Sequence, residues 1–195
     1  SRTDRDWKNN ITILSGDVLG DDIGFSNNTE NVYHVVTGAN GAAIDGFVVE
    51  GGNANGASPY HSGGGIYNNS TVVLRNCTVV GNMAISVGGG MFNSSTWCPT
   101  VHNSIFSGNS AQYGGGMYNY SSPTILDCSF CGNLAQYGAG IYNYSSSMVN
   151  NCNFIGNRTS GYGGGIYNRA ASTVQNCTVS GNYGSGGGVY NYSGP

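Results

Sequence analysis

Apolar residues recur along this chain with a period close to 25 residues. The residue that follows each glycine cluster is apolar, and successive members of this column are 25, 26, 24, 25 and 23 positions apart: Ile66, Met91, Met117, Ile141, Ile166 and Val189. A repeat of this length is typical of solenoids, in which each unit stacks on its neighbours.

Further columns repeat in step with the first. One apolar column holds Leu74, Val101, Ile125, Val149 and Val174. Three residues later stand Cys77, Ser104, Cys128, Cys152 and Cys177. Two residues further on are Val79, Phe106, Phe130, Phe154 and Val179. The last two columns are two residues apart, so they share one face of a strand.

A polar column follows, at Asn82, Asn109, Asn133, Asn157 and Asn182, and two residues later come Ala84, Ala111, Ala135, Thr159 and Gly184. Stacked asparagines form amide-to-amide ladders between neighbouring strands. We therefore expect the asparagine column to connect successive coils.

The spacing excludes the helical repeats, because no apolar pattern at 3, 4 and 7 residues persists. β-Branched and aromatic residues lie in short runs between Gly, Asn and Ser clusters, which predicts about three short strands per coil. Coils stacked in parallel at ~4.8 Å form a right-handed parallel β-helix. We expect one continuous solenoid, with lead-in coils over residues 1–62, including an insertion, and regular coils over residues 63–195.

The lead-in contains a predicted strand over residues 11–14 and a long polar loop over residues 15–31. Trp7 precedes them and is either a cover for the open end of the first coil or an ordinary buried aromatic residue. The loop holds Asp17, Asp21, Asp22 and Glu30. Carboxylate oxygens are the ligands that calcium prefers. A calcium site is therefore one hypothesis for this loop, and an ordinary solvated loop is the other.

Charge is sparse and uneven. Charged residues make up 8% of the chain and the net charge is -3, so no basic patch exists for a nucleic-acid partner. No apolar run is long enough to span a membrane. The chain opens in a polar run and stops at Pro195 partway through another coil, which suggests a segment of a longer secreted precursor, located outside the cell or on a bacterial surface.

Six cysteines are present, and four of them occupy the interior column with Ser104. This placement predicts small buried residues rather than a disulfide framework. Cys131 is predicted to point outward and Cys98 to lie in a turn, so a bridge involving them stays open. A zinc site is not expected, because no pair of cysteines has the second pair or the histidine partners that zinc requires.

An aromatic stripe is predicted on the outside of the coils. Its members follow the interior Ile/Met column by one residue: Tyr67, Phe92, Tyr118, Tyr142, Tyr167 and Tyr190. Beside it lie Tyr120, Tyr144 and Tyr192. Stacked aromatic residues stabilise a sheet face. They also form flat surfaces for sugar rings or proteins, so the stripe is a candidate ligand or assembly surface.

The motifs GGMYN (Gly115 to Asn119) and FCGN (Phe130 to Asn133) resemble the repeats of chlamydial polymorphic membrane proteins, which are surface autotransporter adhesins. They are also similar to those of large secreted bacterial proteins with right-handed parallel β-helix repeats, the choice-of-anchor proteins of the pectin-lyase-like superfamily. There, segments like Asp4 to Asp17, Tyr33 to Gly38 and Asp45 to Gly56 lead into the repeats. The resemblance implies a β-helix and a surface or secreted location.

Catalysis is not expected. Asp127 is the only carboxylate after Glu50, and it stands in a column that is otherwise Asn76, Asn103, Asn151 and Asn176. Glycosidases and β-helix lyases need clustered carboxylates. We therefore predict a non-catalytic extracellular structural or adhesive solenoid, with possible self-association end to end, or a surface glycan or protein as partner. The alternatives are a filament subunit built by end-to-end stacking of coils and a carbohydrate-active enzyme of the pectin-lyase-like class.

Overall fold

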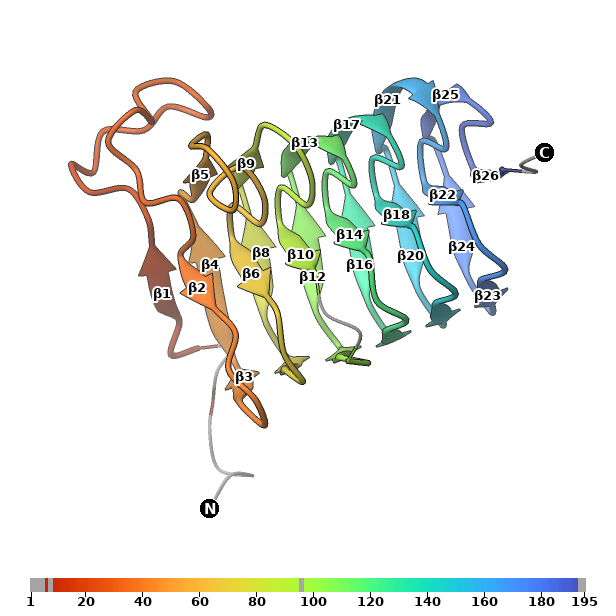
Figure 1. Ribbon diagram of the computed structural model, residues 1–195, viewed down its shortest axis with the longest axis horizontal. Helices are drawn as coiled ribbons and strands as arrows, with labels where there is room; N and C mark the ends of the chain where they lie inside the picture. The colour runs from red at the N-terminus through yellow and green to blue at the C-terminus, as the bar shows by residue number, and fades with distance from the viewer. Residues whose placement is uncertain (1–5, 7–8, 95–96, 193–195) are drawn as a thin grey trace.

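The chain folds into a rod of stacked coils, with its two ends at opposite ends of the rod (Figure 1). The structure is a computed structural model that describes residues 6, 9–94 and 97–192. Trp7, the candidate cover of the first coil, lies outside the described residues. All the regular elements of the described part are β-strands, and they pair in parallel.

Four sheets run along the rod, and each coil contributes one strand to each. Sheet 1 follows the glycine clusters and contains β2 (Val36–Thr37), β6 (Ile66–Asn68), β10 (Met91–Asn93), β14 (Met117–Asn119), β18 (Ile141–Asn143), β22 (Ile166–Asn168) and β26 (Val189–Asn191). Sheet 2 contains β3 (Ala43–Asp45), β7 (Val73–Arg75), β11 (Thr100–His102), β15 (Thr124–Leu126), β19 (Met148–Asn150) and β23 (Thr173–Gln175).

Sheets 3 and 4 complete each coil. Sheet 3 contains β1 (Thr12–Ser15), β4 (Phe47–Glu50), β8 (Thr78–Val80), β12 (Ile105–Ser107), β16 (Ser129–Cys131), β20 (Asn153–Ile155) and β24 (Thr178–Ser180). Sheet 4 contains β5 (Asn53–Ala54), β9 (Met83–Ala84), β13 (Ser110–Tyr113), β17 (Leu134–Tyr137), β21 (Arg158–Tyr162) and β25 (Tyr183–Ser185). The prediction of about three strands per coil was wrong by one, because the alanine column belongs to a separate strand in sheet 4.

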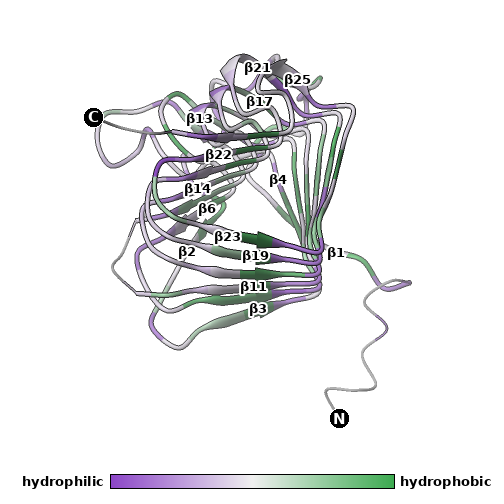
Figure 2. Cartoon of the chain, turned by 90° about the vertical axis from the view of Figure 1, so that its right-hand side faces the viewer, coloured by the Kyte–Doolittle hydropathy of each residue, from purple (hydrophilic) through white to green (hydrophobic). Residues whose placement is uncertain are grey.

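The repeat columns are in register between neighbouring coils, so each column residue lies over the corresponding residue of the next coil. Met91 pairs with Met117 in sheet 1, and Phe106 pairs with Phe130 in sheet 3. Seen from the end of the rod, the corresponding strands of successive coils lie over one another around a common interior (Figure 2). The columns read from the sequence are confirmed as structural columns.

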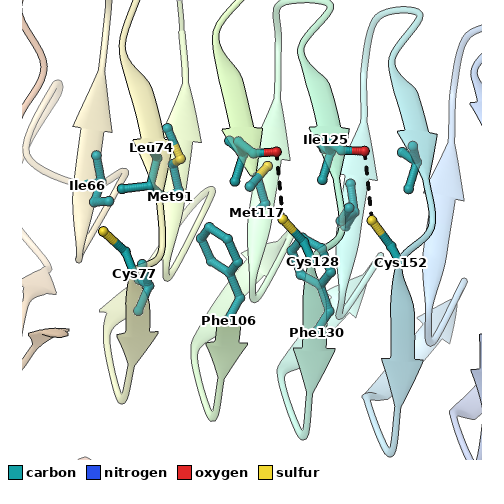
Figure 3. Close-up of a cluster of buried hydrophobic side chains, with 14 of the residues drawn as sticks. Ile66, Leu74, Cys77, Met91, Phe106, Met117, Ile125, Cys128, Phe130 and Cys152 are labelled. Carbon is teal, nitrogen blue, oxygen red and sulfur yellow. Dashed lines mark hydrogen bonds between the residues drawn. The ribbon is translucent and has the colours of Figure 1, made fainter. Parts of the chain in front are cut away.

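The core is a stack of these columns. The side chains of Ile66, Val101 and Phe130 are 0% exposed. The rings of Phe106, Phe130 and Phe154 stack with centroids 5.0 Å apart at each step. Figure 3 shows these interior side chains with the cysteine thiols among them. All six cysteines are free, and Cys77, Cys128 and Cys152 are buried as predicted for the interior column, whereas Cys177 is only partly buried.

The corner between sheets 2 and 3 requires a left-handed backbone conformation. The residue there has φ between 45° and 53° in five coils: Asn76, Asn103, Asp127, Asn151 and Asn176. Asparagine and aspartate tolerate this conformation better than other residues with side chains. Asp127 accepts a hydrogen bond from Asn151 Nδ2 at 2.5 Å. Its interpretation as a variant of a structural position is confirmed.

Two asparagine ladders connect the coils. The predicted one runs through Asn82, Asn109, Asn133, Asn157 and Asn182, with Nδ2 to Oδ1 distances of 2.8 to 3.1 Å. A second one follows the aromatic stripe through Asn68, Asn93, Asn119, Asn143, Asn168 and Asn191, at 2.8 to 2.9 Å. Both ladders are buried except at their last members, where Asn182 is half-buried and Asn191 is exposed, and along them each amide satisfies the next.

Glycine is required where coils approach closely. A Cβ at Gly116 would lie 2.6 Å from the Gly140 carbonyl of the next coil and 3.0 Å from Phe130 Cδ1. A backbone carbonyl cannot move away without breaking the ladder, so only glycine fits. The glycine clusters are therefore packing residues at the corner between sheets 4 and 1.

Candidate binding surface and acidic cluster

The first aromatic row consists of Tyr67, Phe92, Tyr118, Tyr142, Tyr167 and Tyr190, one residue after the interior column of sheet 1. Neighbouring rings are in contact along the whole row, with centroids 4.6 to 5.7 Å apart. From Tyr118 to Tyr167 the planes are nearly parallel, at 7°. The predicted stacking is confirmed from Tyr118 to Tyr190, whereas Phe92 meets its two neighbours at 62° and 57°.

A second aromatic row, which the sequence reading did not single out, lies on sheet 4. It consists of Tyr113, Tyr137 and Tyr162, with centroids 5.5 and 6.1 Å apart. Its members meet the first row edge to face, as in Tyr113 against Tyr142 at 5.6 Å and 80°. A signal was available in the sequence, because each of these tyrosines stands immediately before a glycine cluster.

The glycines between the two rows create a hollow corner. Gly114, Gly138 and Gly163 have φ of 65°, 60° and 70° and follow the tyrosines of the second row directly. The chain turns there from sheet 4 into sheet 1, and glycine adds no side chain to the turn. The corner is therefore concave, with one aromatic row on each wall.

A third aromatic row borders the first on the other side. Tyr120 stacks on Tyr144 with centroids 4.9 Å apart, and Tyr192 lies 6.4 Å from Tyr167. The Arg169 guanidinium sits over the Tyr144 ring at 4.5 Å, a cation–π contact. The three rows together are called the tyrosine surface below.

Two hollows lie along this surface. One, of about 290 Å³, is lined entirely by tyrosines of the three rows: Tyr113, Tyr137, Tyr142, Tyr162, Tyr167, Tyr190 and Tyr192. The other, of about 340 Å³, includes Tyr67, Phe92, Tyr118 and Tyr120. Because both contain members of the first row, they follow one another along the rod axis.

The expectation that the whole first row is exposed was wrong. The side chains of Tyr142 and Tyr167 are only 7% and 8% exposed, because the second and third rows pack on both sides of them. Burial raises the pKa of the Tyr167 hydroxyl to about 12 and also raises the pKa of Tyr118. The accessible rings belong mostly to the flanking rows, with Tyr120, Tyr162 and Tyr192 between 42% and 49% exposed.

Aromatic contacts extend beyond the regular coils at the N-terminal end. His34 lies 4.9 Å from Tyr67 and 5.9 Å from Tyr60, measured between ring centroids. Tyr60, which belongs to the insertion, also stacks on Tyr33 at 5.1 Å. The insertion therefore continues the aromatic surface past Tyr67.

The four predicted calcium ligands come together in space. One carboxylate oxygen from each of Asp17, Asp21, Asp22 and Glu30 lies within 4.8 Å of the others. The loop that carries them, residues 16–31, contains no strand, as predicted. A pocket of about 260 Å³ adjoins the cluster, lined by Asp17 and Asp22 from the loop and by Glu50 from β4.

Outside the cluster, two pairs of oppositely charged side chains lie in contact among the described residues. Asp127 Oδ2 pairs with His102 Nε2 at 2.9 Å. In sheet 2, Arg75 pairs with Asp45 at 3.2 Å. Neither pair borders the tyrosine surface. His61 and Ser62 line the larger of the two hollows, with Nδ1 and Oγ 2.6 Å apart, but no carboxylate is among the described residues that line either hollow.

The fold and its repeats define a parallel β-helix. Compared with known protein families, residues 35–195 match the family described as right handed beta helix region, and the chain belongs to it. Searches of curated proteins and of solved structures returned no match. In the described part of the chain, no helix has the length and hydrophobicity needed to cross a bilayer.

Proposed function

We propose that this chain is a non-catalytic, extracellular β-solenoid of a bacterial surface that binds an extended glycan along its tyrosine surface. The observation that carries the proposal is the concave corner between sheets 4 and 1, walled by two aromatic rows. Aromatic faces pack against the apolar faces of sugar rings, and contiguous exposed aromatic surface is unusual unless it is used for binding.

The repeat of the solenoid supports a polymer as ligand. Coils in a parallel sheet are ~4.8 Å apart, which is close to the length of one sugar unit in an extended chain. Three successive coils each present one ring of the second row, at Tyr113, Tyr137 and Tyr162. A chain lying parallel to the rod axis would therefore meet one of these rings per sugar.

The distribution of charge supports a binding role over a catalytic one. The residues that line the all-tyrosine hollow carry no carboxylate, whereas glycoside hydrolysis uses two. The remaining carboxylate of the regular coils, Asp127, holds a left-handed corner and pairs with His102. The enzyme of the pectin-lyase-like class and the filament subunit stay predictions from the sequence.

Removal of exposed rings tests the proposal. We expect screening against immobilised polysaccharides to identify a glycan ligand, and Tyr162→Ala and Tyr192→Ala each to weaken its binding by about 10-fold, equivalent to ~1.4 kcal/mol. Tyr183→Ala is the matched control, because Tyr183 is 68% exposed but lies on β25 away from the hollow. Equal losses in all three variants, or no binding to any polysaccharide, would contradict the proposal.

Electron microscopy of the purified chain without ligand distinguishes a binding module from a filament subunit. Discrete rods agree with a binding module, whereas regular end-to-end filaments would favour the assembly role. In the filament case the tyrosine variants are expected to leave assembly unchanged, because the tyrosines lie on the side of the rod.

A further inference from the structure

The acidic cluster lies outside the tyrosine surface and needs a separate explanation. Four carboxylates share a small volume, and like charges at this distance repel one another. Neither of the ion pairs found among the described residues involves a member of the cluster. Solvation of an open loop would relieve the repulsion, but part of the cluster is not open to solvent.

Buried oxygens without partners lie in and beside the cluster. Asp22 Oδ1 and Glu30 Oε1 are buried and accept no hydrogen bond. The adjacent Asn31 side chain is only 8% exposed, and its Oδ1 also lacks a partner. A buried acceptor left unpaired is costly unless it is compensated. Two unpaired carboxylate oxygens in the cluster, with a third unpaired oxygen on the adjacent Asn31, indicate a missing positive group.

The Asn31 amide is directed at the cluster. Its Nδ2 donates to Asp22 Oδ2 at 2.7 Å. The two ends of an amide are nearly interchangeable in shape, and their orientation follows the groups around them. With carboxylates alone the nitrogen faces the cluster. With a cation present, a half turn would bring the unpaired Oδ1 to the same place as a fifth ligand.

We propose that Asp17, Asp21, Asp22, Glu30 and Asn31 bind one calcium ion, which joins the two arms of the loop over residues 16–31. Oxygens on opposite sides of a calcium ion are about 5 Å apart, whereas around magnesium they are only about 4 Å apart. The spread of up to 4.8 Å in the cluster fits the larger ion. The absence of nitrogen or sulfur ligands from the set argues against zinc.

The ion would add a link between the two arms of the loop, which are joined by backbone hydrogen bonds at the base and by single side-chain bonds above it, such as Asn27 Nδ2 to Asp21 O at 3.2 Å. Val32 N donates to Gly16 O at 3.0 Å, and Gly16 N donates to Glu50 O at 2.8 Å on β4. Beyond this base, Asp17, Asp21 and Asp22 come from the outgoing arm and Glu30 and Asn31 from the returning arm. Calcium therefore connects two arms that share few backbone hydrogen bonds, and it fixes the loop beside the first coils.

Calorimetry on chelator-treated protein tests the site directly. Calcium chloride is expected to bind with one ion per chain and to raise the melting temperature, with magnesium chloride binding at least 10-fold more weakly. Asp22→Asn and Glu30→Gln preserve side-chain shape and are expected to weaken calcium binding by more than 10-fold. Asp127→Asn is the matched control, because asparagine occupies the same corner in other coils, and it is expected to bind calcium as the original chain does.

A second variant keeps the proposal testable if the cluster variants fold poorly. Asn31→Asp places a permanent oxygen at the amide position and is expected to tighten calcium binding several-fold. Protease digestion measures whether calcium orders the loop itself. Calcium should slow cleavage within residues 18–29 and leave cleavage at other sites unchanged. Absence of calcium binding in the original chain, or equal binding in the Asp22→Asn variant, would overturn the proposal.

Discussion

The interior cysteine column is a position for a small hydrogen-bond donor. Cys128 Sγ donates to Leu126 O at 3.0 Å, and Ser104 Oγ donates to His102 O at 2.9 Å. In both cases the acceptor is the carbonyl just before the left-handed corner residue. Serine therefore replaces cysteine because the two side chains make the same bond. The sequence placed the column inside the rod, but the shared acceptor could be seen only once the corner conformation was known.

Buried thiols should be chemically protected. A hydrogen bond to Cys152 and burial raise the pKa of the Cys128 thiol. Less of it is therefore present as thiolate, which is the reactive form. We expect a thiol alkylating reagent to modify exposed Cys98 rapidly in the native chain, half-buried Cys131 more slowly, and Cys77, Cys128 and Cys152 only after unfolding. Peptide mass spectrometry measures each site, and early modification of Cys128 would contradict this order.

Ionisation of the first aromatic row should destabilise the fold at alkaline pH. Burial raises the pKa of Tyr167 to about 12, whereas an unfolded tyrosine ionises near pH 10. The unfolded chain therefore loses this proton first, so the stabilisation is fully present below pH ~10 and is lost as the pH rises to about 12. Melting temperatures across this range should fall less steeply for Tyr167→Phe than for the original chain. Parallel curves would show that Tyr167 does not contribute.

At the scale of the structural element, the asparagine ladders keep each coil in register with the next. Asn133 Oδ1 accepts from both the backbone N and the Nδ2 of Asn109, at 3.0 and 3.1 Å. Its own Nδ2 donates to Phe106 O and Asn157 Oδ1, both at 2.9 Å. A slip of one residue would leave several of these buried groups unpaired. The ladders therefore specify register as well as adding stability.

Removal of one ladder amide should lower the free energy of unfolding markedly. Asn133→Ala removes the side-chain acceptor of the buried Asn109 backbone N–H, and Phe106 O and Asn157 Oδ1 each lose one donor. A buried group left unpaired costs roughly 1–3 kcal/mol. We expect a loss of about 2–4 kcal/mol in the free energy of unfolding, measured by chemical denaturation. Asn153→Ala is the control, because this asparagine of β20 is exposed, and it should change stability by less than ~0.5 kcal/mol.

For the whole molecule, the period of the sequence was enough to predict the parallel β-helix, its interior columns and one ladder. It was not enough for the second aromatic row or the hollow corner. Tyr113, Tyr137 and Tyr162 belong to a strand that the sequence reading had merged with its neighbours, and concavity depends on the angle between two sheets. The acidic residues were singled out from their chemistry, but their convergence depends on how a loop without a repeat folds back.

A solenoid need not unfold as one unit, because each coil contacts only its neighbours. Burial is highest in the middle coils and falls toward the C-terminal end: Phe154 and Ile166 are 0% exposed, whereas Val174 and Val179 are only partly buried and Val189 is 38% exposed. We expect amide hydrogen exchange of the 195-residue chain to be slowest in β12, β14, β16 and β18, and fastest in β24 to β26, since local opening follows the number of buried contacts. Exchange mass spectrometry with peptides from each coil measures this gradient. Equal protection in all coils would instead show that the ladders couple the rod into a single cooperative unit.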